Sequence, residues 1–330
     1  MIIYSHSWYD IPNTYWEKIK HTKIPVFSIL WDTLVHPAMS ELNIIKYSEY
    51  IAVCDSVSNY FRYRLFFDLF RDNRSQVLFG SGHHIVPEIF NYEPAEKIYD
   101  VTLLGSGEGQ RLEIIRLLQE KSKGSNIKFY KLGGLVNSNL GSHEKGLTDG
   151  WMPLTKYVEV INQSKILICS QTRPERVQVK GKVFEFLACK GFCLIDRNFE
   201  YESLIPEGCV AYFDSPEDLW DKIRYYMDHP EERQKIAATG HRWYIDNFDH
   251  KKHWANVIEY ITGTGNIFPC IPTLDRVYQS LYSKEFSGFT DDIMANAADH
   301  IAAYSSDAGS KSSYRAAGNL SHISTVSLAK

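Results

Sequence analysis

The sequence predicts a two-domain α/β protein with parallel sheets. Short β-branched and apolar runs alternate with longer segments of helical spacing from the first residue to about residue 260, and this order is typical of parallel strands joined by crossover helices. A stretch rich in Gly and Pro divides the alternation into two sets. The length of 330 residues also fits two domains of about 150 residues each. We therefore expect two Rossmann-like domains that face a cleft.

The first set of elements predicts a partial N-terminal domain at residues 1–85. Its expected helices lie near residues 12–20, 38–48 and 56–71. Its expected strands are short runs rich in Val, Ile and aromatic residues: Ile2–Ser5, Val26–Trp31, Ile51–Cys54 and Gln76–Phe79. The chain begins directly with a strand and these units are few, so the domain looks truncated.

The second set is more complete and predicts a C-terminal domain at residues 100–265. Helical spacing recurs near residues 110–121, 153–163, 182–190, 216–228, 230–246 and 250–262. The expected strands between them are Val101–Gly105, Ile127–Leu132, Lys165–Cys169, Phe192–Ile195 and Val210–Phe213. Such apolar runs are typical of strands buried on both faces.

Two segments lie outside these domains. Residues from Gly80 to Pro94 are rich in Gly and Pro and follow neither period, which favours an interdomain linker that we place at residues 86–99. Residues 266–330 are expected to form a helical extension that ends in a low-complexity tail, because Ser, Ala and Gly dominate from Ser306 onward.

Composition argues against several classes of protein. The 36 basic and 40 acidic side chains give a net charge of −4, without the positive excess that nucleic-acid binding needs. No apolar run approaches the ~20 residues of a transmembrane helix, and no signal peptide is visible, so we expect a cytoplasmic protein. The six cysteines fit buried free thiols, because no Cys/His set has zinc spacing. No Asp-x-Asp pair is present either, and we expect no metal site.

A glycine-rich turn is the strongest local sign of a ligand. It runs from Leu103 to Arg111, after an expected strand and before an expected helix, where backbone amides and a helix N-terminus can approach a phosphate. As a dinucleotide motif it fails at Gln110, and no acidic residue follows the next strand. A tight turn without any ligand stays open as an alternative.

A second candidate lies in the apolar helix near residues 182–190. Lys180 and Lys182 stand at its start, against the helix-dipole preference, which makes sense if an anion binds there. Glu185 lies among apolar neighbours and would suit a pair of ribose hydroxyls. The alternative is that Glu185 pairs with Lys182 one turn away and points to solvent.

Histidines and aromatic residues follow several expected strands. His6 ends the first strand and His83 lies in the Gly-rich segment, so both would fall where ligands bind in open α/β folds. We take them as candidate catalytic residues. Four aromatic residues are expected at the same edge, where they could contact a sugar ring: Trp8, Tyr9, Trp31 and Trp151.

Four segments, taken in order, resemble a known family: Asp100–Ser106, Asn162–Ile166, Lys180–Asp196 and Asp218–Gly240. They are similar to the C-terminal domain of the CgeB-like, spore-protein-type glycosyltransferases, which have the GT-B fold of two Rossmann-like domains. The resemblance implies transfer of a sugar from a nucleotide diphosphate-sugar donor to an unknown acceptor, saccharide or other. It implies no metal ion and no further cofactor, and retention is the commoner stereochemical outcome.

The resemblance also implies roles for individual residues. Gly105 and Ser106 would approach the diphosphate, Arg111 or Lys182 would neutralise it, and Glu185 would hold the ribose. His6 matches a histidine that faces the donor sugar.

Two departures keep other functions open. Val177 stands where related transferases often carry a second Glu, and the first strand resembles one from the middle of the family's N-terminal domain. A non-catalytic nucleotide- or sugar-binding protein is therefore the main alternative, followed by an NAD-dependent oxidoreductase.

Overall fold

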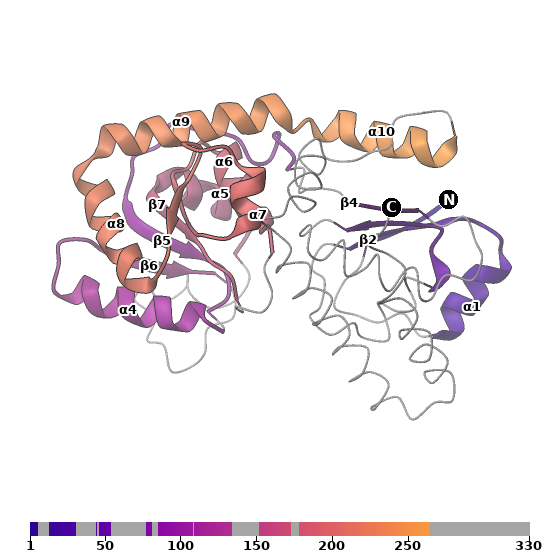
Figure 1. Cartoon of the computed structure of the whole chain (residues 1–330), viewed down its shortest axis with the longest axis horizontal. Coiled ribbons are helices and arrows are strands. Elements are labelled where there is room, and N and C mark those ends of the chain that lie inside the picture. The colour runs from indigo at the N-terminus through magenta and orange to yellow at the C-terminus, as the bar shows by residue number, and fades with distance from the viewer. Residues whose placement is uncertain are drawn as a thin grey trace, which may run out of the picture. The chain divides into compact units, whose positions relative to one another are not determined.

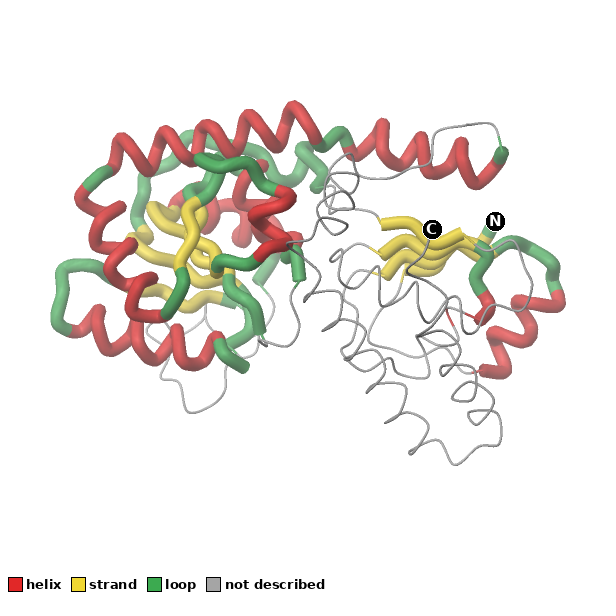
Figure 2. Tube along the Cα trace, in the orientation of Figure 1, coloured by secondary structure: helices red, strands yellow, loops and turns green. Residues whose placement is uncertain are grey.

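The computed structural model describes residues 1–5, 13–30, 44, 46–53, 77–80, 85–107, 109–133, 152–172 and 178–263. The chain divides into two compact units, whose described residues lie within Met1–Gly82 and His83–Phe268. Each unit contains its own sheet of parallel strands (Figures 1 and 2).

The first unit contains a four-stranded sheet in the order β1-β2-β3-β4. Its strands are β1 (Ile2–Ser5), β2 (Val26–Leu30), β3 (Tyr50–Val53) and β4 (Val77–Gly80), and helix α1 (Asn13–His21) joins β1 to β2. All five residues of β2 are buried, as expected for a parallel strand covered on both faces. The strand predictions are therefore confirmed within one residue. The helix predicted near 56–71 lies outside the described residues.

The second unit contains a five-stranded parallel sheet in the order β6-β5-β7-β8-β9. Its strands are β5 (Tyr99–Leu104), β6 (Phe129–Leu132), β7 (Ser164–Cys169), β8 (Cys193–Asp196) and β9 (Ala211–Phe213). The strand order changes direction between β5 and β7. Ligands of open α/β sheets bind at the carboxyl ends of the strands at such a switch point, so the segments after β5 and β7 flank the expected place for one.

Seven helices are described in the second unit. Helix α4 packs against β6 and α8, and α8 packs against β9, whereas α5 and α6 pack against β7 (Figure 1). The helices are α4 (Arg111–Lys123), α5 (Leu154–Gln163), α6 (Gly181–Ala188), α7 (Phe199–Leu204), α8 (Pro216–Asp228), α9 (Pro230–Asn247) and α10 (His250–Thr262). Only α7 was not predicted from the sequence.

The core of the second unit explains why its strands read as continuous apolar runs. On one face, Val101 and Ile168 pack with Ile115 of α4 and Ile223 of α8. The other face is also covered, since Leu167 of β7 is fully buried. The thiols of Cys169, Cys189, Cys193 and Cys209 are buried and unpaired, which confirms the prediction for these four. Within the described part of the chain, no helix is both long and apolar enough to span a membrane.

Candidate functional site

The glycine-rich turn after β5 is held against the segment that follows β7. Gly105 and Gly109 have φ angles of +106° and +58°, which favour glycine. A Cβ atom on Gly109 would overlap the carbonyl oxygen of Thr172, and the Gln110 N–H donates to that oxygen at 3.0 Å. A Cβ atom on Gly105 would collide with Nζ of Lys182. The turn therefore lets a backbone segment and an ammonium group come close together.

Arg111 connects the two segments at the switch point. It is the first residue of α4 and is only 7% exposed. Its Nε atom donates to the Ser170 carbonyl at 2.9 Å, and Nη1 lies 3.4 Å from the carbonyl oxygen and 3.5 Å from Oγ of Ser106. The guanidinium is thus fixed between the carboxyl ends of β5 and β7.

The start of α6 brings two lysines to the same edge of the sheet. Lys180 is the N-cap residue; its N–H donates to the Tyr201 hydroxyl at 3.0 Å, and its Nζ hydrogen-bonds to the Gln178 side chain. Burial, and then the nearby Arg111 charge, lower the pKa of Lys182. Among the described residues, Nζ of Lys182 has no hydrogen-bond or ion-pair partner. An anion placed here would offset the repulsion between Lys182 and Arg111.

Glu185 lies one turn further along α6 and is bound from α5. Its Oε2 accepts a hydrogen bond of 2.5 Å from the Tyr157 hydroxyl. Burial raises the pKa of Glu185, while this hydrogen bond and the Lys182 charge oppose the rise. The alternative that Glu185 pairs with Lys182 and points to solvent is wrong, because the carboxylate is partly buried and its hydrogen-bond partner is Tyr157. Sequence analysis did not identify Tyr157.

The short segment from Ser170 to Thr172 is a further part of the site that sequence analysis missed. The Gln171 side chain donates to the Gln178 carbonyl at 2.6 Å and accepts from the Gln178 N–H at 3.0 Å. The Gln171 N–H donates to Oδ2 of Asp196, at the end of β8, at 2.5 Å. The only local signal for these contacts is a run of polar residues directly after a buried strand.

The structure thus brings together the predicted donor-binding residues Gly105, Ser106, Arg111, Lys180 and Lys182, with Glu185 one turn along α6. The predicted catalytic residues His6 and His83 lie outside the described residues, so their roles stay predictions. The same holds for the four aromatic residues named above and for Val177. In the part of the chain that the structure describes, no three His, Cys, Asp or Glu side chains are grouped as metal ligands.

Comparison with known proteins relates the second unit to glycosyltransferases. Residues 111–259 match the family model described as "Glycosyl transferase-like". The chain is also 25% identical to Spore protein CgeB of Bacillus subtilis (strain 168) over 109 residues, or 30% of this chain and 33% of that protein. The chain therefore matches about a third of the length of this curated relative, in line with the predicted CgeB-like resemblance.

Solved structures support the fold. The structure of TarM matches with a TM-score of 0.51 and 13% identity, over 72% of this chain and 50% of that one. Alr3699/HepE of Anabaena, solved in complex with UDP, matches with a TM-score of 0.55 and 11% identity, over 74% and 73% of the two chains. These likenesses show an α/β fold with parallel sheets of the GT-B-like type. The arrangement of two domains around a cleft, and the truncation of the first, stay predictions.

Proposed function

We propose that the protein is a glycosyltransferase that moves a sugar from a nucleotide diphosphate-sugar donor to a saccharide or other acceptor. The observation that carries the proposal is the position of Lys182, whose ammonium lies against Gly105 and whose pKa is lowered by burial and by Arg111. Two cations and two helix N-termini thus meet at the switch point of the sheet, an arrangement that suits a diphosphate. The family match over residues 111–259 and the fold shared with the UDP complex of HepE support the same conclusion.

The geometry suggests how the site would promote transfer. The departing nucleotide diphosphate gains negative charge in the transition state, and fixed cations and N–H groups stabilise that charge. Arg111 is already fixed by Ser170 and Ser106, so little reorganisation is needed. Lys182 would bind a diphosphate oxygen, and no metal ion would then be required. Glu185, oriented by Tyr157, would accept hydrogen bonds from the ribose hydroxyls.

The catalytic roles rest on the resemblance for His6 and on sequence position for His83. His6 would face the donor sugar, His83 would lie at the same edge of the site, and transfer would proceed with retention of configuration. A nucleotide- or sugar-binding protein without transferase activity is the second candidate, because Val177 occupies the position of the second Glu of related transferases. Release of sugar or nucleotide from a donor incubated with the full chain would exclude this second candidate.

Calorimetry with UDP, GDP and uridine tests the site. We expect Lys182→Ala to weaken binding of the diphosphate by about 10- to 100-fold, the range for a hydrogen bond to a charged group, and to change binding of the nucleoside little. Glu185→Ala should weaken the binding of the diphosphate and of the nucleoside to a similar degree, because both contain the ribose. Glu232→Ala is the matched control, since Glu232 is an exposed carboxylate that accepts from the Tyr225 hydroxyl at 2.7 Å. The site assignment fails if neither diphosphate binds, or if both variants bind like the wild type.

A further inference from the structure

A buried carboxylate on β8 lies beside the site but is not one of the predicted donor-binding residues. We propose that Asp196 is a positioning residue, which holds the segment Ser170–Thr172 in place and through it the cations of the site. The inference rests on the proposed function for the identity of the ligand, whereas the structural role of Asp196 can be tested separately.

Asp196 is placed to act on this segment by strand pairing. It is the last residue of β8, which pairs with β7 so that Ile195 lies opposite Cys169. Its Oδ2 atom accepts the Gln171 N–H at 2.5 Å. Its Oδ1 atom is buried and has no hydrogen-bond partner among the described residues. A buried and half-satisfied carboxylate destabilises a fold, so its presence calls for an explanation other than stability.

The three residues held in this way each anchor a different part of the site. The Ser170 carbonyl accepts from Nε of Arg111, and the Thr172 carbonyl accepts from the N–H of Gln110 in the glycine-rich turn. The Gln171 side chain makes both of its hydrogen bonds to the backbone of Gln178, just before α6. Fixing the Gln171 backbone therefore fixes Arg111, the glycine-rich turn and the approach to Lys182 together.

The charges around Asp196 agree with this role. Burial raises the pKa of Asp196 to about 6, while the Gln171 N–H and the Arg111 and Lys180 charges oppose the rise. The neighbouring titratable groups on β7 and α7 are the Cys169 thiol and the Tyr201 hydroxyl, whose pKa values are both raised, chiefly by burial. Arg111 and Lys180, both cations of the site, thus lie close enough to act on the Asp196 carboxyl.

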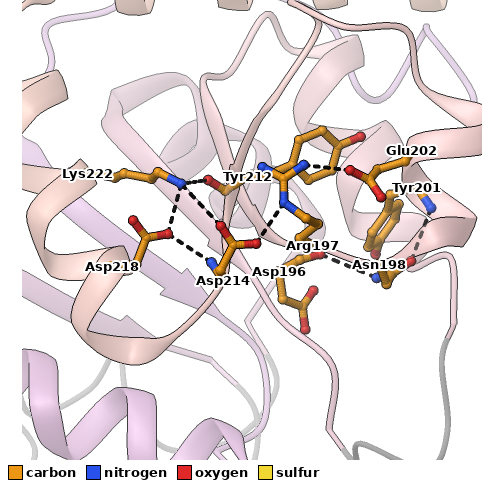
Figure 3. Close-up of polar contacts among 9 residues, drawn as sticks. All are labelled: Asp196, Arg197, Asn198, Tyr201, Glu202, Tyr212, Asp214, Asp218 and Lys222. Atoms are coloured by element: carbon orange, nitrogen blue, oxygen red, sulfur yellow. Dashed lines mark hydrogen bonds and ion pairs between the residues drawn. The ribbon is translucent and has the colours of Figure 1, made fainter.

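The next strand offers a matched control. Asp214 follows β9 and binds Arg197 at 2.7 Å within a partly exposed network that includes Lys222 and Asp218, whereas the Asp196 carboxyl lies apart from this network (Figure 3). The Asp214 side chain is 57% exposed. Its removal takes away a carboxylate from the neighbouring strand without touching the segment after β7.

The experiment compares the full-length wild type with Asp196→Ala, Asp196→Asn and Asp214→Ala. Calorimetry gives the affinity for UDP and uridine, and hydrogen exchange gives the protection of the Gln171 and Gln178 amides. We expect Asp196→Ala to lose about tenfold in UDP affinity, more than in uridine affinity, and to lose protection at both amides. Asp196→Asn should behave nearly like the wild type, because its amide oxygen still accepts the Gln171 N–H. Asp214→Ala should leave both measurements unchanged.

The outcomes separate the two proposals. Wild-type affinity and protection in Asp196→Ala would overturn the positioning role, and so would equal losses in the Ala and Asn variants, because charge rather than the hydrogen bond would then matter. If the wild type binds no nucleotide, the proposed function fails. Even in that case, a loss of amide protection in Asp196→Ala but not in the other variants would support the positioning role of Asp196. Equal protection in all variants would overturn that role.

Discussion

The hydrogen bond between Tyr157 and Glu185 decides how the ribose side of the site is presented. Tyr157 also contacts Phe90 edge to face, with ring centroids 6.3 Å apart, so its hydroxyl is held in one direction. We expect Tyr157→Phe to weaken binding of uridine and of UDP by about tenfold, because Glu185 loses its orienting donor. Binding of inorganic pyrophosphate should not change.

The surface pair Tyr225 and Glu232, joined at 2.7 Å, supplies the control for this variant. Tyr225→Phe removes a similar hydrogen bond of α8, which holds none of the proposed donor-binding residues, and should leave nucleotide affinity unchanged in the same calorimetric titrations. An equal loss for uridine and pyrophosphate in Tyr157→Phe would instead indicate a general disturbance of α5, and would argue against the ribose role of Glu185.

Residues of the site could be predicted from sequence only where a local pattern carries them. Gly105 and Arg111 belong to one turn, and Lys180, Lys182 and Glu185 to the start of one helix, so spacing was enough. The contributions of Tyr157, Gln171 and Asp196 depend on how α5 packs against β7 and on how β7 pairs with β8. Spacing along the chain does not contain that information.

Secondary-structure elements were predicted well for a related reason. The strands of the second unit lie within two residues of their expected limits, because most of their residues are buried and form continuous apolar runs. Helix α7 was missed, since its six residues make less than two turns and show no period. Its usable signals were the N-cap Asn198, which accepts from the Tyr201 N–H at 3.1 Å, and two acidic residues in the first turn.

Packing of α9 against α6 supports the helix that carries Lys182 and Glu185. A Cβ atom on Gly240 would overlap the carbonyl oxygen of Cys209 and press on the side chain of Leu187 in α6. We expect Gly240→Ala to lower the free energy of unfolding by about 1–2 kcal/mol, because overpacking outweighs the gain of about 1 kcal/mol in helix propensity.

Urea unfolding of this variant and of Gly124→Ala would test the prediction. Gly124 caps α4 with a φ angle of −102°, and a methyl group added at its Cα atom would meet no other atom within 4 Å, so an alanine there should be close to neutral. Equal stability of the two variants would show that α9 can shift away from α6 at little cost.

The stability of the whole molecule should respond to pH through two buried groups whose pKa values are shifted in opposite directions. Burial raises the pKa of Asp196 from 3.8 to about 6, so the folded state holds this proton more tightly. Protonated Asp196 therefore adds to the free energy of unfolding below pH 3.8, and this stabilisation is lost as the pH rises through 6. Burial lowers the pKa of His253 from 6.5 to about 4. Its contribution is present above pH 6.5 and is lost as the pH falls through 4.

Each shift corresponds to about 3 kcal/mol, so the two contributions largely cancel between pH 4 and 6 in the wild type. As the pH rises from 4 to 7, the free energy of unfolding of Asp196→Asn should rise by about 3 kcal/mol relative to that of the wild type. The free energy of unfolding of His253→Gln should fall by a similar amount relative to the wild type over the same rise in pH. Any loss of packing in this variant is independent of pH and does not affect this difference. Urea unfolding followed by tryptophan fluorescence at several pH values measures both differences. Parallel curves for the wild type and Asp196→Asn would mean that Asp196 ionises like an exposed carboxylate. Its burial would then not destabilise the fold, and the positioning role would have nothing to explain.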